Sequence, residues 1–104
     1  MASVHGVLRK KIKERKAVIA VVGMGYVGLP MAVEFARKGF TVHGLDSSGK
    51  RIAKLEKGVS YIEDISSAKV AEVVRKGRLL VTTDDSCLGQ ADAVIICVPT
   101  PLNK

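Results

Sequence analysis

Three glycines, Gly23, Gly25 and Gly28, follow a short apolar run in the pattern G-x-G-x-x-G. Gly23 permits a sharp turn, Gly25 lets a pyrophosphate approach the backbone, and Gly28 lets the next helix pack closely on the strand. The unpaired N–H groups around Tyr26 and Val27, at the start of that helix, are expected to point at the phosphates. The pattern predicts a dinucleotide-binding turn, with a purely structural glycine turn as the alternative.

An acidic residue, Asp46, stands 18 residues after Gly28, at the end of a second apolar run. A carboxylate there can accept hydrogen bonds from the adenosine ribose of a dinucleotide. It favours the free 2′-hydroxyl of NAD and repels the 2′-phosphate of NADP. Lys50 and Arg51 follow closely, and they could accommodate a phosphate, lie over the adenine or stay solvated. The cofactor predicted from Asp46 is NAD.

A third candidate, Thr100, lies between Pro99 and Pro101 after the last apolar run. Ligands of open α/β sheets bind at the carboxyl ends of the strands, so its hydroxyl is a candidate cofactor contact. The alternative is a rigid exit from the strand without a ligand. Cys97 has no base near it in sequence and is expected to be a buried, inert thiol. Cys87 has no supporting context either, so we predict no catalytic residue and no metal ligand.

The elements that must position these residues alternate between strands and helices. Strands are predicted over 17–22, from Phe40 or Thr41 to 45, over 79–82 and over 93–98. Helices are predicted over 26–38, from Ser47 or Ser48 to 57, and from Ser66 or Ser67 to 76. This order predicts an α/β fold, a Rossmann-like doubly wound parallel sheet of about four strands in the order 3-2-1-4. Since a complete domain of this kind has six strands, the sheet is expected to be truncated.

The formal net charge of +7 is concentrated near the N-terminus of the 104-residue chain. Residues 9–16 hold six basic residues and one acid, against 11 basic and 9 acidic residues elsewhere. Such a run can bind nucleic acid or an anionic membrane. However, Val4, Leu8 and Ile12 recur at intervals of four residues and favour a helix with one side packed on the domain. We therefore expect neither a nucleic-acid partner nor a membrane partner.

These patterns divide the chain into a basic helix and linker over 1–16 and a partial NAD-binding domain over 17–104. The two cysteines give no disulfide framework, which fits a reduced, cytoplasmic setting. No signal peptide is recognisable, and no stretch approaches the ~18 apolar residues of a membrane span.

Four segments together resemble the N-terminal NAD-binding domain of the UDP-glucose/GDP-mannose dehydrogenase family, over about residues 7–104. They are GMGYVGLPMAVEFARKGFTVHGLD (23–46), GVSYIEDI (58–65), VTTDD (81–85) and ADAVIICVPTPLNK (91–104). The combination of GYVGLP with VPTPLN is specific, whereas G-x-G-x-x-G alone is not. The YIEDI stretch is most similar to the UDP-N-acetylglucosamine 6-dehydrogenase branch.

The resemblance implies roles for individual residues. The backbone of Tyr26 and Val27 would contact the NAD pyrophosphate, and Asp46 would hold the ribose. Arg51 occupies the position of a basic residue that contacts the adenosine end. Thr100 would contact NAD at the edge of the sheet.

The resemblance also implies a reaction. Family members oxidise C6 of a nucleotide-sugar from alcohol to acid in two NAD-dependent steps, through an intermediate held by a catalytic cysteine. That cysteine and its assisting lysine are expected beyond Lys104, and neither Cys87 nor Cys97 matches. We therefore expect an NAD-binding fragment of a UDP-sugar 6-dehydrogenase that is inactive alone. The open edge of its fourth strand predicts self-association, through that edge or through the N-terminal helix.

Two other hypotheses stay open on the sequence. One is the N-terminal domain of a 3-hydroxyacid dehydrogenase, in which the motif after the fourth strand would differ from CVPTPLN. The other is a nucleotide-sensing regulatory domain of the kind that gates potassium transport, which shares the glycine turn and the ribose acid but binds without chemistry.

Overall fold

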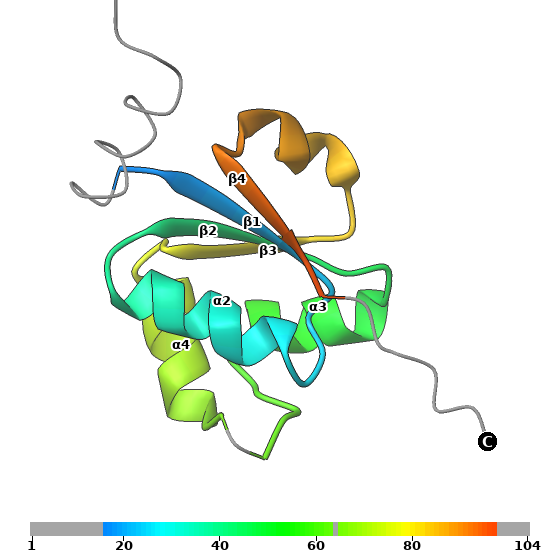
Figure 1. Cartoon of the computed structure of the whole chain (residues 1–104). Helices are drawn as coiled ribbons and strands as arrows, with labels where there is room; N and C mark the ends of the chain where they lie inside the picture. Colours follow the sequence, from blue (N-terminus) through cyan, green and yellow to red (C-terminus); the bar gives the residue numbers. More distant parts are fainter. Residues whose placement is uncertain (1–15, 64, 98–104) are drawn as a thin grey trace, which may run out of the picture.

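A computed structural model describes residues 16–63 and 65–97, which form one parallel sheet with helices packed against it (Figure 1). In chain order the elements are strand β1 (Val18–Val22), helix α2 (Gly28–Arg37), strand β2 (Thr41–Leu45), helix α3 (Gly49–Glu56), helix α4 (Ser67–Arg75), strand β3 (Leu79–Thr82), the 3₁₀ helix η1 (Asp85–Gln90) and strand β4 (Ala93–Ile96). The strand order β3-β2-β1-β4 confirms the predicted fold class and topology.

The strands are aligned so that their carboxyl ends meet. Val22, at the end of β1, is in register with Leu45 of β2 on one side and with Ile96 of β4 on the other. Because parallel strands in register end together, the residues that follow them reach the same edge of the sheet. This alignment brings the glycine turn, Asp46 and Cys97 together.

Helices α2, α3 and α4 cover one face of the sheet, and η1 lies over the other face (Figure 1). Leu29, Val33 and Ala36 of α2 recur at helical spacing and are buried. They belong to the same apolar core as Val21 of β1 and Val42 of β2, both of which are fully buried. Because the two strands and the helix share one core, the turn that joins β1 to α2 is held at both ends.

A second apolar line along this segment, formed by Val27, Met31 and Phe35, is not fully buried. Val27 precedes the helix and its surface is 63% exposed. Phe35 packs against the edge of the core, with its ring at right angles to that of Phe40 and the centroids 6.0 Å apart.

Several predicted boundaries are wrong by one or two residues, and helices α2, α3 and α4 each end one residue before the predicted end. Helix α2 begins at Gly28 instead of Tyr26, since its N-cap, Val27, has no side chain that could close the first turn. Strand β1 begins at Val18 instead of Ala17. Strand β4 ends at Ile96, although the Cys97 N–H still donates to the Val22 carbonyl at 2.7 Å; Val98, its predicted end, lies outside the described residues.

Serine side chains begin the two shorter helices, as predicted. The Ser48 hydroxyl accepts a hydrogen bond from the backbone N–H of Arg51, and the Ser66 hydroxyl accepts one from Lys69. Ser67, the alternative cap of α4, has a different contact: its hydroxyl accepts the Ser60 N–H at 2.9 Å. This bond ties the loop 59–65 to the start of α4.

Strand β4 is an edge of the sheet and exposes apolar side chains. Val94 and Ile96 are 46% and 67% exposed, and β4 pairs only with β1 among the described strands. Self-association through this edge stays a prediction.

Two predicted features lie outside the described residues: the basic helix over 1–16, apart from Lys16, and the Pro99-Thr100-Pro101 exit. Within 16–63 and 65–97, no helix combines the length and apolar character that crossing a membrane requires.

Candidate dinucleotide-binding site

A cleft of about 1050 Å³ opens at the carboxyl ends of the strands. One side is the glycine turn and Asp46, and the other is the segment 83–85 that follows β3. Six of the eight predicted cofactor residues line it: Gly23, Gly25, Tyr26, Val27, Asp46 and Arg51. Of the other two, Gly28 is buried beneath the turn, and Thr100 lies outside the described residues.

Two glycines of the motif are required by the packing of the chain itself. Gly23 has a φ of +97°, and a β-carbon there would overlap the carbonyl oxygen of Cys97. A β-carbon on Gly28 would overlap the carbonyl oxygen of Gly23. In both cases the obstacle is backbone, which a side-chain movement cannot relieve. These two residues allow β4, the turn and α2 to approach one another closely.

The third glycine faces open space. A β-carbon on Gly25 would meet only the Arg51 Nη1, at 3.6 Å. Beside it, the N–H groups of Tyr26 and Val27 donate to no acceptor in the described part of the chain. They lie just before the positive end of the α2 dipole, which favours a bound anion. An oxygen-rich group such as a pyrophosphate fits this cradle by charge and by hydrogen bonding.

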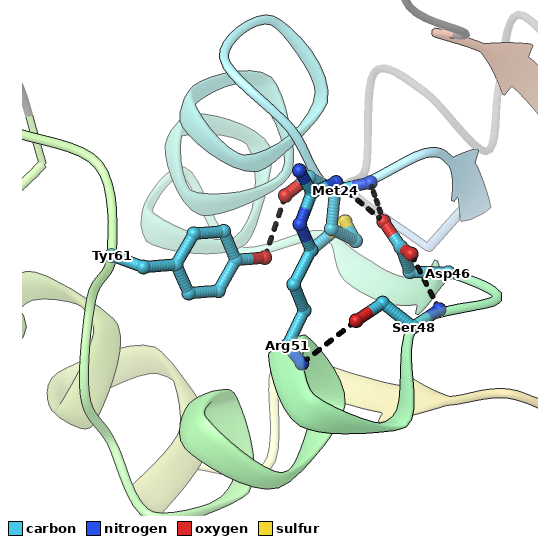
Figure 2. A network of polar contacts seen from close by, with 5 residues as sticks. All are labelled: Met24, Asp46, Ser48, Arg51 and Tyr61. Carbon is cyan, nitrogen blue, oxygen red and sulfur yellow. Dashed lines mark hydrogen bonds and ion pairs between the residues drawn. The ribbon is translucent and has the colours of Figure 1, made fainter.

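Asp46 is 7% exposed and its carboxylate accepts hydrogen bonds from three donors in two segments, the glycine turn and the start of α3 (Figure 2). Its Oδ2 accepts the Met24 N–H at 2.8 Å and the Arg51 Nη1 at 3.3 Å. Its Oδ1 accepts the Ser48 N–H at 2.8 Å. The residue predicted to read the ribose therefore also ties the glycine turn to the start of α3.

These contacts decide the charge of Asp46. Burial alone would raise its pKa, but the N–H groups of Ser48 and Met24 and the charge of Arg51 outweigh burial and hold the pKa below 3.8. Asp46 is thus ionised at neutral pH. A carboxylate offers about four acceptor positions, and three are used, which leaves one on Oδ1 for a ligand hydroxyl.

Arg51 lies between Asp46 and an aromatic ring. Its guanidinium carbon is 5.6 Å from the centroid of the Tyr61 ring, a cation–π geometry. Its Nη1 also donates to the Asp46 carboxylate, at 3.3 Å. Of the roles considered for Arg51 from the sequence, this placement disfavours a free phosphate-binding cation, because the charge of Asp46 already balances it.

The sequence analysis missed two residues of this network, Met24 and Tyr61. The Tyr61 hydroxyl donates to the Met24 carbonyl at 2.6 Å, and the Met24 side chain is fully buried over Gly44. Burial raises the pKa of Tyr61 to about 12; the Arg51 charge opposes this and the Asp46 charge adds to it. The sequence does show a tyrosine in the loop 59–65 and a glycine, Gly44, inside a strand. Neither feature indicates that its partner is Met24.

Cys97 differs from what was predicted, whereas nothing contradicts the prediction for Cys87. Cys97 follows β4 instead of lying within it, and it is half-buried on the wall of the cleft instead of fully buried. Burial, together with the charge of Asp84, raises the pKa of Cys87 and disfavours its thiolate. Among residues 16–63 and 65–97, no three His, Cys, Asp or Glu side chains gather in a way that suits a metal ion.

Residues 17–104 match a protein-family model described as the NAD-binding domain of the UDP-glucose/GDP-mannose dehydrogenase family. Among curated proteins, the UDP-N-acetyl-D-mannosamine dehydrogenase of Pyrococcus horikoshii is 42% identical over 86 residues, which cover 82% of this chain and 21% of that protein. The UDP-N-acetyl-D-glucosamine 6-dehydrogenase of Pseudomonas aeruginosa is 40% identical over 86 residues, covering 83% of this chain and 19% of that protein. The chain thus spans about a fifth of the length of these relatives.

Solved structures give the same similarity in three dimensions. A ternary complex of GDP-mannose dehydrogenase from Pseudomonas aeruginosa superimposes with a TM-score of 0.77 at 35% identity, over 83% of this chain and 20% of that one. The UDP-N-acetyl-mannosamine dehydrogenase structure from Pyrococcus horikoshii also gives 0.77, at 41% identity, over 83% and 21% of the two chains.

Proposed function

The chain belongs to the UDP-glucose/GDP-mannose dehydrogenase family and carries its NAD-binding domain, and we propose that the whole protein oxidises the C6 alcohol of a UDP-N-acetylhexosamine to a carboxylate with two NAD. The names of the relatives support this substrate class, since they act on UDP-N-acetyl-D-mannosamine and UDP-N-acetyl-D-glucosamine. Family membership displaces the sensor-domain and 3-hydroxyacid dehydrogenase hypotheses. The division into a helix and linker over 1–16 and an NAD-binding domain over 17–104 is part of this proposal.

We propose that NAD lies along the cleft in one orientation. Its pyrophosphate accepts hydrogen bonds from the N–H groups of Tyr26 and Val27, over the space that Gly25 leaves open. Its adenosine ribose donates to the free acceptor position of Asp46. Arg51 contacts the adenosine end, and Thr100 contacts the cofactor further along the sheet edge. When bound, NAD supplies the acceptor for the hydride that leaves C6.

The observation that carries the choice of NAD over NADP is the environment of Asp46. A 2′-phosphate would place additional negative charge against a nearly buried carboxylate. The nearest cation, Arg51, is already paired with that carboxylate at 3.3 Å. Arg51, the cation among the described residues that line the cleft, could therefore receive the phosphate only by first leaving Asp46.

The first test compares the two cofactors. Isothermal titration calorimetry on the complete gene product is expected to show NAD binding, with NADP weaker by about tenfold or more, which corresponds to roughly 1.4 kcal/mol. The 104-residue chain alone is expected to bind NAD weakly at best. Equal or tighter binding of NADP would overturn the proposed role of Asp46. Absence of NAD binding would overturn the cofactor site itself.

The second test concerns the reaction. The complete gene product is expected to form two NADH per UDP-N-acetylhexosamine, measured at 340 nm, with UDP-glucose and GDP-mannose as comparison substrates. The 104-residue chain alone is expected to form none. Turnover by the chain alone, or a preference for GDP-mannose, would contradict the proposal.

We further propose that the protein works in the cytoplasm, where thiols such as Cys87 and Cys97 stay reduced. We also propose that the chain associates with itself through the exposed edge of β4. Sedimentation velocity tests the second point: the sedimentation coefficient is expected to rise with concentration, and a monomer throughout would refute it.

A further inference from the structure

We propose that Tyr61 is a positioning residue of the cofactor site: its hydroxyl fixes the Met24 carbonyl and thereby aims the N–H groups of Tyr26 and Val27 at the pyrophosphate. Tyr61 lies 37 residues from Met24 in sequence, in the loop 59–65, outside the glycine motif. The inference rests on the proposed NAD site and adds a residue to it.

Met24, between Gly23 and Gly25, is held in three ways (Figure 2). Its N–H donates to Asp46 and its carbonyl accepts from Tyr61, at 2.8 and 2.6 Å. Its side chain is fully buried, with its tip in the space that the absent side chain of Gly44 leaves. The peptide groups on both sides of Met24 therefore have fixed orientations.

The residues after Met24 have few restraints of their own. The N–H groups of Tyr26 and Val27 have no acceptor among the described residues, and both side chains are exposed. The main local bond is from the Leu29 N–H to the Gly25 carbonyl at 3.1 Å. Residue 25 is also a glycine, the residue type with the greatest backbone conformational freedom. The direction of the cradle thus depends on how firmly Met24 is held before it.

Tyr61 is itself held in place by its neighbours. The Ser60 N–H donates to the Ser67 hydroxyl, at the start of α4. Ile62, on the other side, is buried in the apolar core. The residues on both sides of Tyr61 are therefore held in place, so little conformational entropy is lost when its hydroxyl bonds to the Met24 carbonyl.

The ring and the hydroxyl of Tyr61 have separable roles. The hydroxyl reaches the pyrophosphate turn through Met24, whereas the ring lies under the guanidinium of Arg51 at the adenosine end. A phenylalanine keeps the ring contact and loses the hydrogen bond. A leucine loses both.

The test measures NAD affinity of the complete gene product by calorimetry for the wild type, Tyr61→Phe and Tyr61→Leu. Loss of one neutral hydrogen bond is expected to raise the Kd of Tyr61→Phe about three- to tenfold, and Tyr61→Leu is expected to be weaker still. Val59→Ala, an exposed substitution in the same loop, is the matched control and is expected to leave the Kd unchanged.

Two further measurements separate positioning from a general structural role. In the complete gene product, Tyr61→Phe is expected to raise the KM for NAD while kcat and the KM for the sugar stay within about twofold. In the 104-residue chain without NAD, the amide NMR signals of Gly25, Tyr26 and Val27 are expected to shift or broaden in Tyr61→Phe, with the core signals unchanged.

Three outcomes would overturn the proposed function, the inference, or both. If the wild type does not bind NAD, the proposed function fails and the inference with it. If the wild type binds and Tyr61→Phe binds equally well, only the inference is overturned. If Tyr61→Phe loses its fold by circular dichroism, the hydroxyl supports the whole domain and its assignment to the turn is wrong.

Discussion

Two carboxylates at the ends of neighbouring strands, Asp46 after β2 and Asp84 after β3, have very different surroundings. Asp46 is nearly buried and accepts hydrogen bonds from Met24, Ser48 and Arg51, of which Met24 is distant in sequence. Asp84 is exposed, and within the described residues its side chain accepts only the Ser86 N–H, at 2.9 Å, in the turn that begins η1. Both line the same cleft. A position at the end of a strand is therefore not sufficient to bury and orient a carboxylate. Hydrogen bonds from a segment distant in sequence are also needed.

The same contrast divides the two sides of the cleft. We call the glycine turn and Asp46 the anchored side, and residues 83–90 the peripheral side. On the anchored side, a β-carbon on Gly28 would overlap backbone. On the peripheral side, a β-carbon on Gly89 would meet nothing within 4 Å. The predictions below test whether this difference is energetic as well as geometric.

The largest effect is expected from Gly28→Ala. Its β-carbon would displace the Gly23 carbonyl and push α2 away from β1, at a cost of about 3 kcal/mol or more in unfolding free energy. Urea unfolding followed by circular dichroism measures this. The matched control is Gly89→Ala, which is expected to stay within about 0.5 kcal/mol of wild type. Similar losses in both variants would remove the distinction between the two sides.

Asp46→Asn is expected to have the next largest effect. An amide nitrogen cannot accept hydrogen bonds, so either the Met24 or the Ser48 N–H loses its partner, at about 1–3 kcal/mol. Asp84→Asn keeps an oxygen for the Ser86 N–H and is expected to cost less than about 0.5 kcal/mol. Melting temperatures compare the two. NAD affinity is expected to fall in Asp46→Asn; equal affinity in both variants would place the ribose elsewhere.

The smallest expected effect is in the pH dependence of stability. The pKa of Asp46 is below 3.8 in the folded chain, so the unfolded chain takes up the proton first as the pH falls. The stabilisation from Asp46 is complete above pH 3.8 and is lost as the pH falls through the folded pKa. The difference in unfolding free energy between wild type and Asp46→Asn should therefore shrink below pH 3.8. A constant difference would show that Asp46 owes its effect to shape alone.

Much of the fold follows from local sequence. The apolar runs and the glycine and serine boundaries predicted the strands, the helices and the order of the sheet, because a parallel sheet with crossover helices allows few arrangements. The start of α2 was misplaced, since Val27 carries no capping signal. The close approach of Cys97, just after β4, to Gly23 was also not predicted, since it is a contact between distant segments.

The site divides in the same way. Spacing alone predicted the glycine turn and Asp46, because each acts near its own strand end. The sequence allowed several roles for Arg51. Its position between Asp46 and Tyr61 depends on the path of the loop 59–65, which the sequence does not reveal. The bond from Tyr61 to Met24 spans 37 residues and has no sequence period that would reveal it.

The packing of the Met24 side chain over Gly44 has a consequence for how the sequences of related proteins evolve. A β-carbon on Gly44 would lie 2.6 Å from the Met24 Cε, the end of a flexible side chain rather than backbone. A larger residue at position 44 thus becomes acceptable when position 24 becomes smaller. We expect positions 24 and 44 to vary together among related sequences. The size of the residue at position 44, in β2, should then depend on the size of the residue at position 24, in the glycine turn.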